Sequence, residues 1–215
     1  MLNDILFKDR NEAGERLADR LSAASEKYDL VLAIPRGGLP LGAIIAQRLH
    51  LPLDVVLTKK IGARHNKEYA IGALSLKGRI LEPQADESDP AYIESETKRI
   101  RKLLQERDDK YHQKKKRHEV KHQRIILVDD GIATGSTMLA TVDLLHKEGA
   151  EQIILAIPVA PSSAVRKLMS SPNIDKVVCL HQPRHFYAIG QFYRDFSQIS
   201  DEQAIAILES TEMVL

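Results

Sequence analysis

The sequence predicts an α/β fold, in which a doubly wound parallel sheet of about five strands carries helices on both faces. Two observations predict it. Short apolar runs alternate with amphipathic segments along the chain, and no repeat or low-complexity tract interrupts them. The first of these runs also begins a strand–loop–helix–strand unit of about 30 residues, which is the size of a βαβ motif.

The first part of the chain supplies this βαβ unit. Ala13, Leu17 and Leu21 recur at helical spacing, and the next apolar run is followed by Arg-Gly-Gly. These patterns predict helices at 9–27 and 39–49, and strands at 30–35 and 53–58. Residues 59–62 (Lys-Lys-Ile-Gly) are predicted to form the loop that closes the second strand.

The middle of the chain, residues 62–123, is predicted to be an insertion. Its parts are a hairpin at 69–82 around Lys77-Gly78, a polar loop at 83–90 and a long helix at 91–117. Apolar residues recur in this helix at helical spacing, at Ile93, Ile100, Leu103, Leu104 and Tyr111. They are expected to share one face, since residues three, four and seven apart lie side by side on a helix.

The remainder of the chain continues the alternation. Strands are predicted at 124–130, 152–159 and 176–180, and helices at 136–148, 162–169 and 201–209. Residues 181–215 are expected to form a small C-terminal hood with the last of these helices. A chain of 215 residues has the size of one large domain, so 1–215 is expected to be a single domain.

Composition excludes several classes of protein. Lys plus Arg number 31 and Asp plus Glu 30, so a wholly basic nucleic-acid coat protein and an acidic tail protein are excluded. The single cysteine, Cys179, excludes an intramolecular disulfide framework and a multi-cysteine zinc site. No apolar run approaches the ~18 residues that span a bilayer, and the N-terminal segment has no apolar signal core. A soluble, cytoplasmic protein without a membrane partner is therefore expected.

The segment most informative about chemistry is 128–137, Val-Asp-Asp-Gly-Ile-Ala-Thr-Gly-Ser-Thr. An apolar strand delivers two adjacent carboxylates, Asp129 and Asp130, and a loop of small residues then enters a helix. Such a loop lets backbone N–H groups surround an anion, and the helix start adds unsatisfied N–H groups and a positive dipole end. The carboxylates need hydroxyls or a divalent cation as partners. The pattern therefore predicts a sugar phosphate, with Mg²⁺ as the cation.

The stretch 124–138, which contains this loop, resembles the phosphoribosyl-diphosphate (PRPP) signature of type I phosphoribosyltransferases. The sequence Ile-Pro-Arg-Gly-Gly at 34–38 resembles the family's diphosphate-binding loop after its first core strand. Lys59 and Lys60 end the next predicted strand, where the family often supplies a second diphosphate contact. Most of the chain follows this layout, and the whole sequence resembles a bacterial subgroup of uncharacterised phosphoribosyltransferase-domain proteins.

The resemblance implies a role for each of these residues. Asp129 and Asp130 would hold the ribose 2′- and 3′-hydroxyls, directly or through Mg²⁺. The 5′-phosphate would be wrapped by Ala133, Thr134, Gly135, Ser136 and Thr137. Diphosphate would be held by Arg36, Gly37, Gly38 and one of Lys59 and Lys60. The expected catalytic residues are Asp129, Asp130, Arg36 and Lys60, and part of the insertion would close over the site.

The expected activity is Mg²⁺-dependent transfer of 5-phosphoribosyl from PRPP to a nitrogenous, nucleobase-like acceptor, with release of diphosphate. The chain departs from one family feature. Several purine-using members carry a carboxylate at the position of Ala133, where it can assist proton transfer near the base, and alanine cannot do so. This departure weakens purine salvage as the activity and leaves PRPP binding unaffected. By family habit, a homodimer is expected.

Aromatic residues concentrate near the C-terminus. Five of the ten lie within 186–196, namely Phe186, Tyr187, Phe192, Tyr193 and Phe196. In the resembled family a variable C-terminal hood binds the acceptor, so Phe186 and Tyr187 are the preferred candidates for stacking on its ring. Packing of the hood onto the core would use the same five residues, and the sequence leaves both interpretations open.

Two other functions stay open at the sequence level. Residues 98–124 hold twelve Lys and Arg against four acids, which suits a PRPP- or nucleotide-sensing regulator that binds nucleic acid through this segment. Only Tyr111 accompanies this charge, so the segment lacks an aromatic stacking platform and nucleic acid is the less favoured partner. A phosphoribosyl hydrolase or phosphorylase with the same site is the other alternative.

Overall fold

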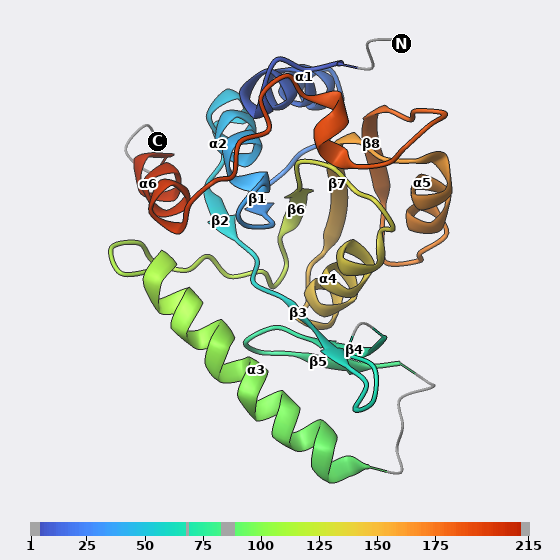
Figure 1. The fold of residues 1–215 in the computed structure, drawn as a ribbon. Helices are drawn as coiled ribbons and strands as arrows, with labels where there is room; N and C mark the ends of the chain where they lie inside the picture. The colour runs from blue at the N-terminus through green and yellow to red at the C-terminus, as the bar shows by residue number, and fades with distance from the viewer. Residues whose placement is uncertain (1–4, 68, 83–88, 212–215) are drawn as a thin grey trace.

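Five strands form a parallel sheet at the centre of a computed structural model that describes residues 5–67, 69–82 and 89–211 (Figure 1). The sheet order is β2-β1-β6-β7-β8, and every neighbouring pair is parallel. The strands are β1 (Leu30–Ala33), β2 (Leu53–Val55), β6 (Arg124–Val128), β7 (Gln152–Val159) and β8 (Lys176–His181). The order reverses direction between β1 and β6, and this confirms the predicted doubly wound parallel sheet.

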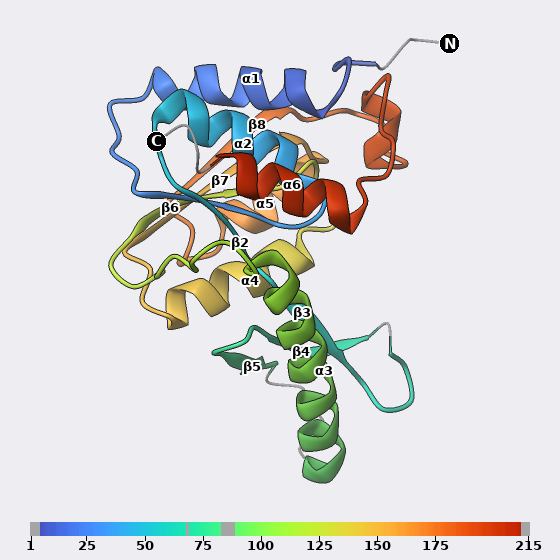
Figure 2. The same ribbon diagram turned by 90° about the vertical axis from the view of Figure 1, so that its left-hand side faces the viewer.

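Helices cover both faces of this sheet, because alternate residues of each strand point to opposite sides. Val31 and Ala33 of β1 share one buried cluster with α1 (Arg10–Ser22), α2 (Gly38–Leu49) and α6 (Asp201–Thr211). Leu30 and Leu32 belong to a second cluster with α4 (Ser136–Lys147) and α5 (Ser162–Met169). Figure 2 shows α1, α2 and α6 on one side of the sheet and α4 on the other. Each face therefore has its own hydrophobic core.

A second, antiparallel sheet of three strands lies beyond α4 (Figures 1 and 2). It consists of β3 (Lys59–Gly62), β4 (Ala70–Leu74) and β5 (Arg79–Leu81), so the predicted hairpin is present with one further strand. Two expectations are corrected here. The predicted strand 53–58 ends at Val55, and residues 59–62 form a strand in place of the predicted loop. Pairing of 59–62 with β4, which buries Ile61, decides this, and a local pattern cannot reveal such a partner.

The long helix α3 (Pro90–Tyr111) packs against this small sheet through the predicted apolar face. It begins where the Asp89 carboxylate accepts a hydrogen bond from the Tyr92 N–H. It ends at Tyr111, six residues before the predicted 117. The next residue, His112, leaves the helical conformation with φ −108° and ψ 22°, and its ring contacts the Asp54 and Asp108 carboxylates. Of the predicted loop at 83–90, residues 83–88 lie outside the described part.

The hood joins the N-terminal segment through main-chain hydrogen bonds. The Leu6 and Phe7 N–H groups donate to the Phe192 carbonyl, and the Arg194 N–H donates to the Phe7 carbonyl at 2.9 Å. A short 3₁₀ turn, η1 (Ile189–Phe192), lies between β8 and this junction. Helix α1 spans Arg10–Ser22, shorter than the predicted 9–27, while α6 extends to Thr211. None of the helices in the described ranges is long and apolar enough to cross a membrane.

Candidate active site

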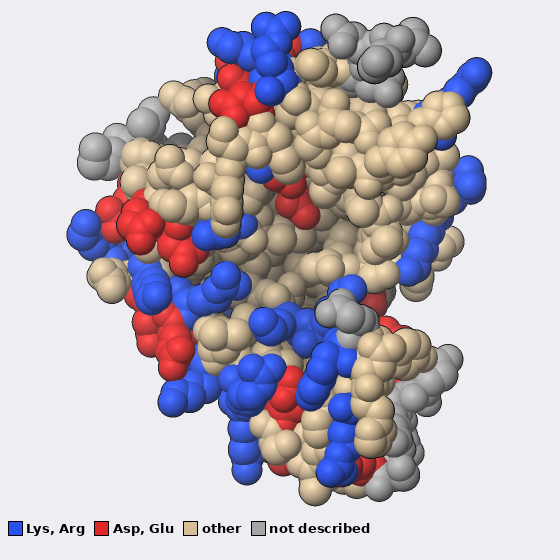
Figure 3. Space-filling model, viewed as in Figure 1, with Lys and Arg blue, Asp and Glu red and all other residues tan. Residues whose placement is uncertain are grey.

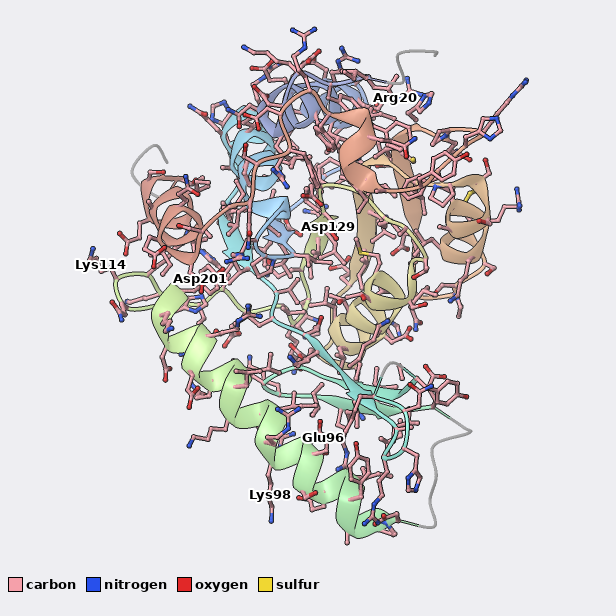
Figure 4. The ribbon with its side chains drawn as sticks, in the orientation of Figure 1. Arg20, Glu96, Lys98, Lys114, Asp129 and Asp201 are labelled. Carbon is pink, nitrogen blue, oxygen red and sulfur yellow. The ribbon has the colours of Figure 1, made fainter. Side chains whose placement is uncertain are left out.

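The carboxyl ends of β1 and β6 lie side by side, and a loop begins at each of them. The Ile34 N–H, just after β1, donates to the Val128 carbonyl at the end of β6 at 2.9 Å. This register brings loop 34–38 next to Asp129 and Asp130. Figure 3 shows acidic atoms inside a hollow in the middle of this face, and Figure 4 labels Asp129 at that place. Open α/β sheets bind ligands at such an edge.

The loop that follows the two acids enters α4 without a capping side chain. Gly135 has φ +76°, a left-handed conformation that favours glycine, and the helix starts at Ser136 with no side-chain hydrogen bond at its cap. Ala133, Thr134 and Thr137 are exposed, and the Lys167 ammonium donates to the Ser136 hydroxyl at 3.3 Å. Uncapped N–H groups, the helix dipole and a nearby lysine form a site suited to an anion.

The two acids of the loop have different surroundings. Asp129 is half-buried and faces the hollow, and one of its carboxylate oxygens accepts from the Asp130 N–H at 2.9 Å. Asp130 is buried, and its carboxylate accepts from the Arg10 guanidinium at 2.9 Å. Burial, then repulsion from Asp130, raises the pKa of Asp129. Burial also raises the pKa of Asp130, and Arg10 partly opposes it. Together the two acids carry more negative charge than Arg10 neutralises.

The two glycines of loop 34–38 allow this loop to touch the acids. A Cβ on Gly37 would lie 2.1 Å from the Asp130 Oδ2 atom, and one on Gly38 would lie 2.6 Å from the Val128 carbonyl oxygen. Gly37 has φ −63°, an ordinary value, so close approach and not backbone conformation demands glycine there. The Pro35–Arg36 peptide bond in the same loop is cis. The structure thus brings the two predicted ligand-binding loops into contact.

The basic side chains predicted to hold diphosphate lie around the hollow, and none of them forms an ion pair with Asp129 or Asp130. The Arg36 guanidinium lies 3.5 Å from the Asp201 carboxylate at the start of α6. Lys59 and Lys60 are exposed on β3 and point to opposite sides of it. Lys59 lies on the side of α3, where it acts on the Glu96 carboxylate. In Figure 3 Lys and Arg side chains gather below the hollow, over β3–β5 and α3.

Most of the clustered aromatics pack within the molecule. The Tyr193 hydroxyl donates to the Asp130 carbonyl at 2.6 Å, and its ring stacks on Phe196 at 4.9 Å. Phe186 is half-buried against Phe192, with ring centroids 5.5 Å apart, whereas Tyr187 is 87% exposed. Hood packing therefore accounts for Phe192, Tyr193 and Phe196. Phe186 and Tyr187 stay predicted acceptor contacts.

Two of these site residues escaped the sequence reasoning. Arg10 precedes Asp130 by 120 positions, and its only local signal is one charge on the otherwise apolar face of α1. Tyr193 stood out as an aromatic, but its hydrogen bond to the Asp130 carbonyl depends on how the hood folds back. Both residues contact Asp130 only because distant segments meet at the end of β6.

Comparisons with known proteins agree with this geometry. The family model described as phosphoribosyl transferase domain matches residues 7–197. The crystal structure of TT1426 from Thermus thermophilus is 37% identical with a TM-score of 0.87, over 96% of this chain and 99% of that one.

Two curated relatives extend this comparison. A Mycobacterium tuberculosis protein, named as a candidate phosphoribosyl transferase, is 36% identical over 95% of this chain and 46% of its own length. The chain thus spans about half of that relative. An adenine phosphoribosyltransferase from Bordetella parapertussis is 29% identical over 73% of this chain and 66% of its own length. Because the family model matches residues 7–197, the chain belongs to the phosphoribosyl transferase domain family.

Proposed function

We propose that this protein is a phosphoribosyltransferase that transfers 5-phosphoribosyl from PRPP to a nitrogenous acceptor and releases diphosphate. One observation carries the proposal: two adjacent carboxylates, Asp129 half-buried and Asp130 buried, lie one short loop before the uncapped start of α4, and Asp130 touches a glycine loop from the neighbouring strand. Acids suit the ribose hydroxyls, and the helix start suits a phosphate. One edge of the sheet thus offers a place for each charged or hydroxylated part of PRPP.

Each part of the ligand has its own proposed residues. Asp129, which faces the hollow, holds the 2′- and 3′-hydroxyls, and the Asp130 N–H supports its carboxylate from behind. Residues 133–137 hold the 5′-phosphate through their N–H and hydroxyl groups. Gly37 and Gly38 offer backbone N–H groups to the diphosphate, and Arg36 turns from Asp201 to reach it. Lys60 completes this set, since Lys59 points toward α3.

The acids also fit a magnesium ion. Burial raises the pKa of Asp129 and of Asp130, and repulsion from Asp130 adds to the rise at Asp129. Two adjacent carboxylates beside one guanidinium also leave an excess of negative charge. A divalent cation relieves such an excess, and Mg²⁺ typically uses one or two carboxylates together with substrate oxygens. Mg²⁺ would supply charge stabilisation for the departing diphosphate. Asp129 would hold it, directly or through water, with Asp130 adding its charge from behind.

In the described part of the chain, Ala133 occupies the position where several family members carry a base. Ala133 is exposed and carries no group that can move a proton. We therefore propose an acceptor nitrogen that needs no strong base, with Phe186 or Tyr187 against its ring. Tyr187 is the more accessible of the two, because 87% of it is exposed. A homodimer remains part of the proposal.

The nucleic-acid alternative is less favoured by the surroundings of the basic segment. Several cations of 98–124 form ion pairs within the molecule. Arg99 pairs with Glu96, Arg117 with Asp108, and Arg124 with Asp29. The pKa of Asp29 falls to about 2 because Arg124 donates to it. Charges engaged in this way contribute less to phosphate binding.

Isothermal titration with PRPP and Mg²⁺ tests the proposal. Binding by the wild type that is lost in Asp129→Ala/Asp130→Ala supports it, and a wild type that does not bind PRPP refutes it. Diphosphate release is then assayed against a panel of bases and amines. Release that needs an acceptor identifies the transferase, whereas equal release without any acceptor indicates the hydrolase alternative.

A further inference from the structure

Arg10 makes three contacts at the base of the candidate site. Its Nε donates to the Asp130 carboxylate at 2.9 Å, and its Nη1 donates to the Ser197 carbonyl at 2.8 Å. Its guanidinium carbon lies 3.9 Å from the ring centroid of Phe196. Arg10 is only 9% exposed although it belongs to the first turn of α1. The hood and α1 together therefore fix its charge beside Asp130.

The position of Asp130 poses an electrostatic problem. Its Oδ2 atom, which Arg10 contacts, abuts Gly37 so closely that a Cβ there would be 2.1 Å away. Loop 34–38 is the proposed binding site of diphosphate, which is the most highly charged part of PRPP. A bare carboxylate directly behind this loop would repel that group, and repulsion is strong in a buried setting.

We propose that Arg10 is a positioning residue that neutralises and fixes Asp130 behind the Gly37 loop, so that this loop can accept diphosphate. This inference rests on the proposed function. Arg10 acts through Asp130 and not on the substrate, since the carboxylate and Gly37 stand between them. The 5′-phosphate loop begins on the other side of the acids, at the start of α4. Arg10 should therefore matter for diphosphate and much less for ribose 5-phosphate.

Four variants separate charge neutralisation from packing. Arg10→Met removes the charge and keeps much of the volume, and Arg10→Lys keeps the charge. Arg10→Met/Asp130→Asn removes both charges. Arg20→Met is the matched control, because Arg20 lies on the same helix and is exposed (Figure 4). Each is titrated with inorganic diphosphate, with ribose 5-phosphate and with PRPP, all with Mg²⁺, and its Tm is measured.

The expected pattern is specific to the diphosphate ligands. Arg10→Met lowers affinity for diphosphate and PRPP at least about tenfold, since one partner of a buried charge pair is left alone. Its affinity for ribose 5-phosphate changes less than about threefold. Its Tm falls by about 10 °C. Arg10→Lys retains most of the diphosphate affinity, and the double variant recovers both Tm and diphosphate affinity relative to Arg10→Met.

The possible outcomes distinguish a failure of the proposed function from a failure of the proposed role of Arg10. A wild type that binds neither PRPP nor diphosphate overturns the proposed function and this inference with it. A wild type that binds, with an Arg10→Met variant that weakens all three ligands equally, leaves the function standing and overturns the role of Arg10. So does a double variant that regains Tm without diphosphate affinity, because neutralisation of Asp130 would then not be what diphosphate binding requires.

Discussion

At the residue scale, the candidate site depends on close approach and on neutralisation of charge. Gly37 lets loop 34–38 touch Asp130, and Arg10 supplies the charge that this contact requires. Asp129 is left as the acid that faces the hollow. The Asp-Asp pair is thus one motif in the sequence and two different chemical environments in the structure.

Replacement of Gly37 by alanine tests the close approach. The backbone conformation there suits alanine, so the expected loss comes from the 2.1 Å contact with Asp130 alone. We expect the free energy of unfolding to fall by about 2–3 kcal/mol. Urea unfolding measures it, with Gly135→Ala as the comparison. At Gly135 the nearest atom would be 3.6 Å away, so only its positive φ matters, at about 1 kcal/mol. A smaller loss for Gly37→Ala than for Gly135→Ala would contradict this reasoning.

At the element scale, two helix ends define the surroundings of the site. The start of α4 has no capping side chain among the described residues, and Lys167 donates to the Ser136 hydroxyl. The end of α3 is tied to β2 through His112, whose ring lies 2.9 Å from the Asp54 carboxylate and 3.0 Å from the Asp108 carboxylate. One end is open to an anion, and the other anchors the insertion to the main sheet.

A carboxylate introduced at the start of α4 should affect thermal stability and phosphate binding in opposite ways. Ser136→Asp places a negative charge at the positive end of the helix dipole, so Tm should stay the same or rise slightly. The same charge repels a phosphate, and affinity for ribose 5-phosphate should fall at least about tenfold. Titration calorimetry and thermal unfolding measure the two effects. Ser163→Asp, in the first turn of α5, is the matched control and should leave this affinity unchanged.

The anchor at His112 should make stability depend on pH. Burial alone lowers the pKa of His112, but hydrogen bonds and charge from Asp54 and Asp108 outweigh it, so the pKa is raised above 6.5. Its contribution to stability is therefore fully present below pH 6.5 and is lost as pH rises through the folded-state pKa.

Substitution of His112 measures this dependence. His112→Gln should cost about 3 kcal/mol at pH 6 and less at pH 9, because only the charged imidazole pairs with the buried acids. Arg117, which also pairs with Asp108, remains in the variant. Urea unfolding at both pH values provides the measurement, with the exposed His146→Gln as control. An equal cost at pH 6 and pH 9 would count against the charged pair.

At the scale of the whole molecule, one hydrophobic cluster joins the main sheet to the insertion. It runs from α1 and α2 through Leu57 to Ile61, Leu74 and the buried face of α3. Although Figures 1 and 2 show β3–β5 and α3 beyond the main body, this core is continuous. The insertion should therefore unfold together with the rest of the chain.

Calorimetry of a core variant in α3 tests this cooperativity. Ile100 is fully buried, so Ile100→Ala should lower the Tm of one common transition by about 8 °C. Lys102→Ala, on the exposed face of the same helix, should hardly change it. Two separate transitions, with only one shifted by Ile100→Ala, would show that the insertion unfolds independently.

Comparison of sequence and structure shows which kinds of feature could be predicted. Helix and strand periodicity, together with the loop 128–137, led to the parallel sheet and to the uncapped helix start. The sequence patterns did not reveal those element boundaries that depend on contacts between residues far apart in the chain. Lys59 and Lys60 became part of a strand because β4 lies beside them, and His112, the residue after the end of α3, contacts Asp54.

By itself, the sequence determined the fold class, the order of the elements and the two loops at the sheet edge, because these depend on local periodicity and short motifs. Only the tertiary structure decided what surrounds the two acids. It placed Arg10 behind Asp130, committed Tyr193 and Phe196 to packing, and turned Lys59 away from Lys60. The physical reason is that charge neutralisation and burial depend on groups far apart in the sequence, since Arg10 meets Asp130 across 120 positions and Tyr193 meets the Asp130 carbonyl across 63.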